Sequence, residues 1–293
     1  MLVALKGTDP RMKSSERTCD NPADALMCPW VEAALWRIYR DFFDAAERKR
    51  RWRIREDVPW DQCNPNLDPA IADVVETFCC VELYLPDYVS KVLPLARNSM
   101  GRAWFYANWG YEESKHSLVL SDWLLRSGHR SEEYMHDLER KVFEREWNLP
   151  MGNSLGMLVY AMVQEHATFV NYRNLRQRVP ARGGDPALER LLSFISIDEA
   201  AHFGLFRSFV ELFMRVDRDL VIAALRPVLN QFQMPAIHDL LDESKKRIAA
   251  ICDLELFNEE IFMRDIYNHF LKILGVTKAE LRGPRLKKSL LAS

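Results

Sequence analysis

The sequence predicts an all-α fold, and three observations support this prediction. Apolar residues make up 48% of the 293-residue chain, whereas glycine occupies only 11 positions, fewer than the turns of an all-β protein need. Prolines and capping residues recur just before apolar stretches with helical period. No segment shows convincing strand alternation. We therefore expect a helical protein that is long enough to bury a large core.

The first clear helix start is Asp68, an N-cap residue followed by Pro69 at the first helical position. The apolar pattern continues from there to about Ala96, and Pro86 predicts a kink in this helix one turn after Glu82. Further helices are expected over about 99–126, from 131 to before 150, and over 153–177, 185–216, 219–231, 236–252 and 255–274. The Thr277-x-x-Glu280 pattern predicts a capping box near the end.

Composition and charge predict the domain organisation of the chain and its location in the cell. Residues 1–21 look like a polar leader, and residues 22–293 like one helical domain whose core spans about 68–216. A net charge of −2 does not favour nucleic-acid binding. No apolar run approaches the roughly 18 to 20 residues that span a bilayer, so we expect a soluble protein without membrane insertion. Six scattered cysteines and the lack of a signal-peptide core favour reduced thiols in a cytoplasmic protein.

The Glu-x-x-His pattern occurs three times, and helical period separates these occurrences. Glu113-Ser-Lys-His116 and Glu199-Ala-Ala-His202 each lie within an apolar stripe, so their ionisable groups face the core. Glu133-Tyr-Met-His136 lies on a polar face and is interpreted as a solvated coincidence.

Two more acids, Glu82 and Glu165, also fall within apolar stripes. Four buried carboxylates need a common counter-charge, and no lysine or arginine on these stripes supplies it. Two divalent cations would supply this counter-charge.

The spacing along the chain predicts how these ligands meet. Glu82 precedes Glu113 by 31 residues and Glu165 precedes Glu199 by 34, and a predicted helix break lies midway in each case. Residues equidistant from the turn of an antiparallel helix pair lie at equal height. The pattern is therefore that of a ferritin-like four-helix bundle, with flanking helices, that holds a di-iron or di-manganese centre. The predicted metal ligands are Glu82, Glu113, His116, Glu165, Glu199 and His202.

These residues resemble the motifs of the soluble acyl-acyl-carrier-protein desaturases. The matching segments are Trp109-Gly-Tyr-Glu112-Glu113-Ser-Lys-His116, Asp198-Glu199-Ala-Ala-His202, Gln164-Glu165-His166-Ala167-Thr168-Phe169, Glu82-Leu-Tyr-Leu85-Pro86, and Trp52 with Pro59. His166 stands where an arginine is common in that family, and the chain is shorter past the bundle, which leaves the substrate open.

The resemblance implies two iron ions, Fe2+ in the reduced state. It assigns Glu82 and Glu165 as terminal ligands, Glu113 and Glu199 as bridging ligands, and His116 and His202 as one imidazole per iron.

Three more residues gain expected roles from the resemblance. Asp198 would hold the outer nitrogen of a ligand histidine, or else be a rim charge. Thr168 would hydrogen-bond iron-bound oxygen, or else bond to its own helix carbonyl. Trp52 would belong to a route from the surface to a histidine, or else fill the core.

The implied activity is the O2-dependent introduction of a double bond into an acyl chain carried as an acyl-carrier-protein thioester, with electrons from a ferredoxin-type donor. A homodimer is expected. A basic cluster over residues 48–55 would dock the acidic carrier, or else be ordinary solvated surface. Two alternatives stay open: a di-iron hydroxylase or N-oxygenase of a small or carrier-bound metabolite, and a non-enzymatic iron-binding bundle.

Overall fold

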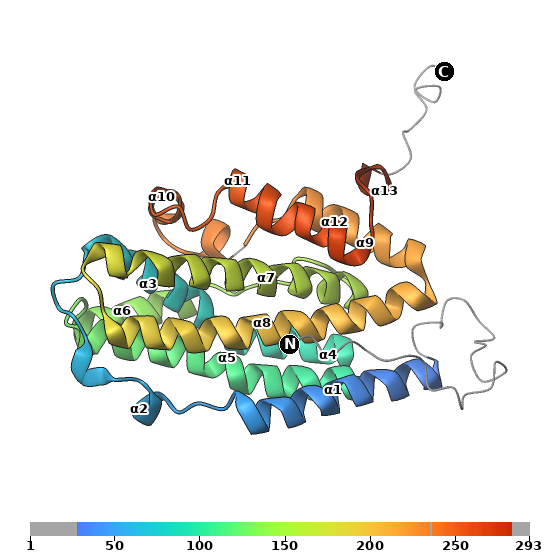
Figure 1. The fold of residues 1–293 in the computed structure, drawn as a ribbon, viewed down its shortest axis with the longest axis horizontal. Helices are drawn as coiled ribbons and strands as arrows, with labels where there is room; N and C mark the ends of the chain where they lie inside the picture. The colour runs from blue at the N-terminus through green and yellow to red at the C-terminus, as the bar shows by residue number, and fades with distance from the viewer. Residues whose placement is uncertain (1–27, 235, 283–293) are drawn as a thin grey trace, which may run out of the picture.

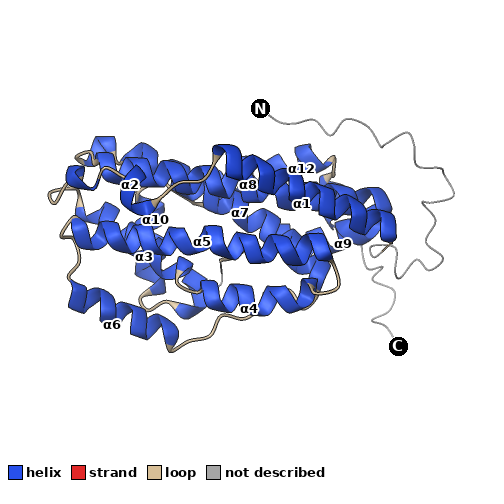
Figure 2. Ribbon diagram, turned by 90° about the horizontal axis from the view of Figure 1, so that it is seen from below, coloured by secondary structure: helices blue, strands red, loops and turns tan. Residues whose placement is uncertain are grey.

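The computed structural model describes residues 28–234 and 236–282, and within these ranges the regular elements are all helices (Figure 2). The predicted all-α fold is confirmed. The expected leader at 1–21 lies outside the described residues. The elements are α1 (Pro29–Lys49), α2 (Ile54–Asp57), η3 (Trp60–Gln62), α3 (Pro69–Glu82), α4 (Leu85–Ala96), α5 (Met100–Arg126), α6 (Glu132–Phe143), α7 (Ser154–Arg178), η4 (Pro180–Arg182), α8 (Pro186–Val216), α9 (Arg218–Asn230), η5 (Ala236–Leu240), α10 (Ser244–Asp253), α11 (Glu259–Ile261), η6 (Phe262–Tyr267), α12 (Asn268–Leu274) and α13 (Lys278–Arg282).

Four helices form the central bundle. α3 packs on α5, α7 packs along α8, and α5 also contacts α8. α1 runs beside α5 on one side of this bundle, whereas α9, α10 and α12 lie over α7 on the opposite side (Figure 1). The core between the helices is rich in large apolar side chains, among which Trp123, Phe105, Phe206 and Phe209 are fully buried.

Side-chain caps fix most of the predicted helix starts. Asp68, Ser131, Asn153 and Asp185 each accept a hydrogen bond from a backbone N–H in the first turn of the following helix. These bonds satisfy amides that the helix itself leaves unpaired. Residues 277–280 form the predicted capping box at the start of α13.

The helix expected over 68–96 is in fact two helices. α3 ends at Glu82 and α4 begins at Leu85, because Pro86 cannot donate to the carbonyl four residues earlier. A single kinked helix was therefore the wrong expectation here, and Glu82 is the last residue of α3.

The expected helices at 236–252 and 255–274 also differ from those in the structure. The first is divided into the π-helical turn η5 and α10, and the second begins only at Glu259 and passes through the π-helical turn η6. The long helix α1 has no counterpart among the expected helices.

Two further expectations concern thiols and membranes. Cys63, Cys79, Cys80 and Cys252 are free, but Cys28 is disulfide-bonded, so the expectation of reduced thiols is wrong at that position. Over the described ranges, no helix has both the length and the apolar character that crossing a membrane requires.

Candidate metal centre

The four bundle helices bring all six predicted ligands to one buried level. Their side chains are Glu82 on α3, Glu113 and His116 on α5, Glu165 on α7, and Glu199 and His202 on α8, and none is more than 6% exposed. They form two overlapping groups of four residues, and the ligand atoms of each group lie within 4.8 Å of one another.

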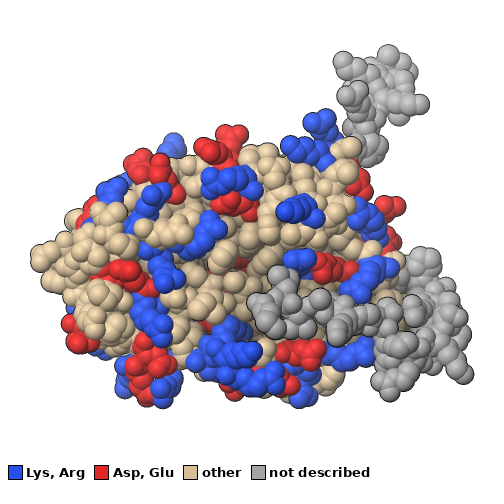
Figure 3. All heavy atoms as spheres, viewed as in Figure 1, with Lys and Arg blue, Asp and Glu red and all other residues tan. Residues whose placement is uncertain are grey.

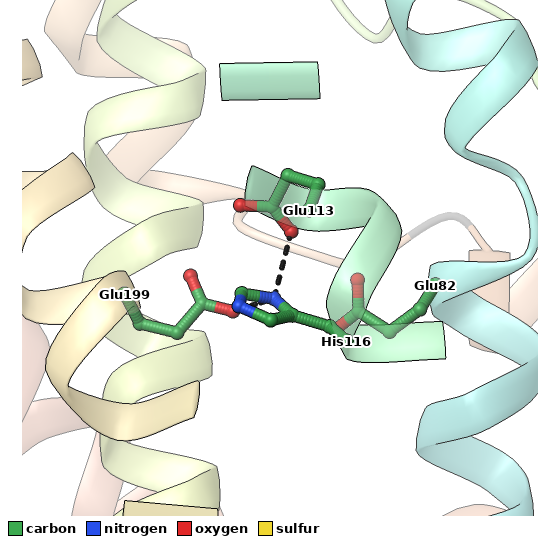
Figure 4. Close-up of side chains that lie close together, drawn as sticks. All are labelled: Glu82, Glu113, His116 and Glu199. Atoms are coloured by element: carbon green, nitrogen blue, oxygen red, sulfur yellow. Dashed lines mark hydrogen bonds and ion pairs between the residues drawn. The ribbon is translucent and has the colours of Figure 1, made fainter. Parts of the chain in front are cut away.

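The first group contains Glu82, Glu113, His116 and Glu199 (Figure 4), and the second contains Glu113, Glu165, Glu199 and His202. Glu113 and Glu199 belong to both groups, so they would stand between two ions if each group held one.

Both imidazoles turn the same ring nitrogen toward the carboxylates. His116 Nδ1 lies 3.0 Å from Glu113 Oε2 and 3.4 Å from Glu199 Oε1. His202 Nδ1 lies 2.8 Å from Glu113 Oε1 and 3.4 Å from Glu165 Oε2. Each Nδ1 is therefore the atom available to a metal ion at this level.

The residues fit a pair of metal ions because their inward atoms lack other partners. Among the described residues, the buried atoms Glu113 Oε1, Glu165 Oε2, Glu199 Oε1 and His202 Nδ1 make no hydrogen bond of regular geometry, and their short contacts are with one another and with His116. Buried polar atoms are normally paired. Carboxylate oxygen and imidazole nitrogen together are the donor set of di-iron and di-manganese bundles.

The charges of the site also favour bound cations. Burial raises the pKa of Glu82 and Glu165 well above the usual value, and neighbouring carboxylates raise it further. Burial also opposes ionisation of Glu199, but the nearby imidazoles of His116 and His202 outweigh it and lower its pKa to about 2. Without cations, protons must compensate this concentration of negative charge. Divalent ions would displace those protons, so metal binding and pH are linked.

Asp198 lies on the outer side of His116. Its carboxylate accepts from Trp52 Nε1 at 2.7 Å and from Arg50 at 2.6 Å, and it lies 3.5 Å from His116 Nε2. Burial opposes ionisation, but His116 and Arg50 outweigh it and lower the pKa of Asp198 to about 2. The carboxylate is thus held charged where it can fix the orientation of the imidazole.

Glu112 occupies the equivalent position at His202, and the sequence predictions missed this role. His202 Nε2 lies 2.8 Å from Glu112, which also pairs with Arg50 at 2.7 Å and Arg51 at 2.5 Å. Despite burial, the contacts with His202 and Arg50 lower the pKa of Glu112. One signal could have found it: an acid directly precedes each glutamate that belongs to both groups, Glu112 on α5 and Asp198 on α8.

The structure places the other candidate residues as follows. The Thr168 hydroxyl donates to the carbonyl of Gln164, which is the local alternative the sequence left open, although its side chain also lines a cavity beside Glu82. Glu133 and His136 are exposed on α6, outside both groups.

The basic cluster is divided between interior and surface. Arg50 and Arg51 turn inward to the acids around the histidines, whereas Arg48, Lys49, Arg53 and Arg55 are exposed. A reading of the whole cluster as solvated or docking surface is therefore wrong for Arg50 and Arg51.

Comparisons with known proteins agree with this geometry. The model of a family described as fatty acid desaturase matches residues 74–280, which include the six clustered side chains. The acyl-[acyl-carrier-protein] desaturase 7, chloroplastic, of Oryza sativa subsp. indica is 28% identical over 253 residues, which cover 75% of this chain. Desaturase 6, chloroplastic, of Oryza sativa subsp. japonica is 30% identical over 128 residues, covering 42% of this chain and 30% of its own length. The chain spans only 58% of the length of desaturase 7.

A solved structure shares the fold. The X-ray structure of DesA2 from Mycobacterium tuberculosis H37Rv, described provisionally as an acyl-ACP desaturase, superposes with a TM-score of 0.63. The match covers 86% of this chain and 97% of DesA2 at 18% sequence identity. The ferritin-like bundle expected from the ligand spacing is thus an architecture that DesA2 also adopts.

Proposed function

Because the chain belongs to the fatty acid desaturase family, in its acyl-acyl-carrier-protein type, we propose that it is a di-iron desaturase that introduces a double bond into an acyl chain held as a carrier-protein thioester. The observation that carries the proposal is the pair of buried carboxylate and histidine groups sharing Glu113 and Glu199. The reaction would use O2 and two electrons from a ferredoxin-type donor.

Glu82 and His116 would bind one iron, Glu165 and His202 the other, and Glu113 and Glu199 both. When bound, the two ions supply the chemistry of O2 reduction and C–H oxidation. Four carboxylates balance the charge of two Fe2+ ions, so the loaded centre is neutral and suits a buried site.

The protein's own contribution is orientation and the exclusion of water. Glu112 pairs with the outer nitrogen of His202 at 2.8 Å, and Asp198 faces that of His116 at 3.5 Å, so both carboxylates would keep Nδ1 of the rings directed inward. The aromatic and aliphatic side chains around the bundle level keep the site dry, which protects reactive species from side reactions.

Two neighbouring cavities with mostly apolar lining, one of them beside Glu82, support an acyl substrate. Phe78, Val81, Met234 and Ile237 line a small cavity against Glu82, together with Thr168 and Tyr172. A second cavity of about 100 Å³ shares Phe78, Met234 and Ile237 with the first. The lining of this second cavity is mostly apolar, which suits a short segment of an alkyl chain.

Product mass tests the proposal. Protein loaded with Fe2+, reduced with dithionite and supplied with O2 and stearoyl-acyl carrier protein should release an acyl product lighter by two hydrogens. Glu113→Ala should release none, while Glu133→Ala, in the exposed Glu-x-x-His of α6, should behave as wild type. A product heavier by one oxygen would favour the hydroxylase alternative, and iron uptake without any oxidised product would favour an iron-binding bundle.

The oligomeric state and location belong to the same proposal. Met100, Trp104, Tyr111 and Leu118 are exposed along α5 and offer an apolar surface to a second copy. We expect a homodimer in the cytoplasm, and light scattering of the full chain gives the mass directly.

A further inference from the structure

Tyr172 is a buried phenol in direct contact with the candidate metal centre. It lies seven residues after Glu165 on α7, about two helical turns, so both side chains lie on the same face of that helix. The Tyr172 hydroxyl reaches across the bundle to α3 and donates to Glu82 Oε1 at 2.6 Å. The side chain is only 1% exposed. A single contact therefore joins this phenol to a predicted ligand, out of reach of solvent.

The other buried tyrosines have different partners. The hydroxyls of Tyr88 and Tyr160 donate to backbone carbonyls, at 2.8 Å and 3.3 Å, and the hydroxyl of Tyr84 has no partner among the described residues. A peptide carbonyl is a much weaker base than a carboxylate. Over residues 28–234 and 236–282, Tyr172 is the one buried tyrosine whose hydroxyl donates to a carboxylate.

This contact gives Tyr172 a chemistry that a buried aliphatic or phenylalanine side chain lacks. Phenols can lose a single electron, and a phenol that has lost one becomes strongly acidic. The electron therefore leaves readily only where a base within hydrogen-bond distance takes the proton. Glu82 Oε1 is such a base, and Glu82 is also a predicted ligand of the metal ion that would take the electron.

The surroundings of Tyr172 would protect an oxidised ring. Its ring meets that of Phe78 edge-on, with centroids 5.2 Å apart and an interplanar angle of 73°. Val81 and Ile237 line the same small cavity beside Glu82. Charged side chains of both signs lie on the molecular surface seen in Figure 3, whereas this cavity is enclosed mostly by apolar groups. Such enclosure keeps water and external reductants away from a reactive group.

The cavity also places Tyr172 beside the space proposed for the acyl chain. Tyr172, Thr168 and Glu82 all contribute to its lining. An acyl chain bound there would offer its own C–H bonds for oxidation. When no chain is bound, the phenol of Tyr172 is an oxidisable group in the same cavity.

We propose that Tyr172 is an internal electron donor: in the absence of an acyl chain it gives one electron to the oxidised metal centre and its proton to Glu82, and becomes a phenoxyl radical. The inference rests on the proposed function, which supplies the two metal ions and O2. Reduction of O2 to two waters takes four electrons and four protons. Two electrons come from the two Fe2+ ions, which become Fe3+, one from Tyr172, and one from an external single-electron donor. One proton comes from Tyr172 by way of Glu82, and three come from solvent.

Electron paramagnetic resonance tests the radical directly. Protein loaded with Fe2+, given one further equivalent of Fe2+ as the external donor and mixed with O2 without acyl thioester, should show an organic radical after freeze-quenching. Ring-deuterated tyrosine should narrow its proton splitting. Tyr172→Phe should lose the signal at equal iron content. Tyr106→Phe, which changes a buried tyrosine without a hydrogen bond to any of the six ligands, should keep it.

Two results of this experiment would overturn the proposal. One is an undiminished radical in Tyr172→Phe. The other is a gain of one oxygen atom in the peptide that contains Tyr172, since the ring would then have been hydroxylated instead of losing an electron.

Added substrate separates this role from the proposed function. Stearoyl-acyl carrier protein, bound before O2 is added, should suppress the radical in wild type, because two C–H bonds then supply the last two electrons. An undiminished radical alongside full product formation would overturn the link with the cavity. Wild-type protein that desaturates the chain but forms no radical without it would overturn the role of Tyr172 and leave the proposed function standing. A radical that depends on Tyr172, without any desaturated product, would support that role and contradict the proposed function.

Discussion

The α3–α5 and α7–α8 halves of the bundle supply the same ligands on different backbones. Each half sets one glutamate opposite a Glu-x-x-His segment at one level. α7 continues without a break on both sides of Glu165, but α3 ends at Glu82. The Tyr172 hydroxyl of α7 donates to Glu82 at 2.6 Å, whereas the buried Oε2 atom of Glu165 has no such donor. The metal-ligand pattern therefore does not require matching helices, because contacts from the other half can hold a ligand in place.

The surroundings of the two histidines differ as well. Behind His116, Asp198 connects to an aromatic side chain, Trp52. Behind His202, Glu112 connects to guanidinium groups. Two similar ligands thus have different surroundings: the carboxylate behind His116 contacts an indole, and the carboxylate behind His202 contacts two guanidinium groups.

The largest effect should follow from removing a carboxylate that both halves share. Glu199→Ala should lose both metal ions, because the two groups of ligands have this residue in common. Glu133→Ala, in the exposed Glu-x-x-His of α6, should keep the wild-type content. Plasma mass spectrometry of iron-loaded, desalted protein measures this, and stoichiometric iron in Glu199→Ala would contradict the assignment of shared ligands.

Replacing the carboxylates behind the two histidines should weaken metal binding to a similar extent, but the two substitutions should differ in their effect on reduction. Asp198→Asn and Glu112→Gln should each weaken metal binding by about 10- to 100-fold, as is typical for the partners of ligating histidines. Only Asp198→Asn should also slow reduction of the loaded centre by ferredoxin, because only Asp198 contacts Trp52. Stopped-flow absorbance on fully loaded variants separates the effects. Equal slowing in both would show that the two histidines are not distinguished in this way.

The broken α3 helix has a buried ionic anchor before its ligand, whereas the ion pairs of α7, from Arg173 and Arg178, come after Glu165. Glu76, six residues before Glu82, pairs with Arg130 at 2.5 Å and Arg247 at 2.9 Å, while the corresponding position before Glu165 is the buried Val159. Removing one partner of a buried ion pair leaves the others uncompensated, so Glu76→Gln should lower the free energy of unfolding by about 2 kcal/mol at pH 7.

The pH dependence of this loss has a definite sign. Burial opposes ionisation of Glu76, but Arg130 and Arg247 outweigh it and lower the pKa in the folded state. The stabilisation is therefore complete above the unfolded-state pKa, about 4.5, and disappears as the pH falls through the lower folded value. Urea unfolding of wild type and Glu76→Gln should converge at low pH. A constant difference across this range would mean that the substitution acts through packing alone.

The same comparison shows what the sequence can and cannot predict. Helical period and spacing predicted the four bundle helices and the meeting of Glu82, Glu113, Glu165 and Glu199, because both follow from local geometry. Arg50 and Arg51 turn inward because α1 packs against α5. The periodicity of the helices that carry the carboxylates contains no information about this packing.

Two other features were missed for different physical reasons. The end of α3 depends on whether the bundle tolerates a kink at Pro86 or a break, which is a tertiary choice. The role of Glu112 was hidden because a residue directly before a ligand points about 100° away around the helix, toward α8 rather than along the stripe that periodicity detects.

The smallest effect should come from the contact that compensates for the shortened α3. Tyr172→Phe removes the hydroxyl that donates to Glu82 and keeps the ring that packs against Phe78. Loss of one hydrogen bond to a carboxylate should cost about 1 to 2 kcal/mol. The effect should appear mainly as weaker binding of the metal ion in the group that contains Glu82, and competition with a chelator measures it. The control is Tyr106→Phe, which changes a buried tyrosine without a hydrogen bond to any of the six ligands. If both variants hold the two ions equally, Glu82 is positioned by α3 alone, and the two halves are more alike than their backbones indicate.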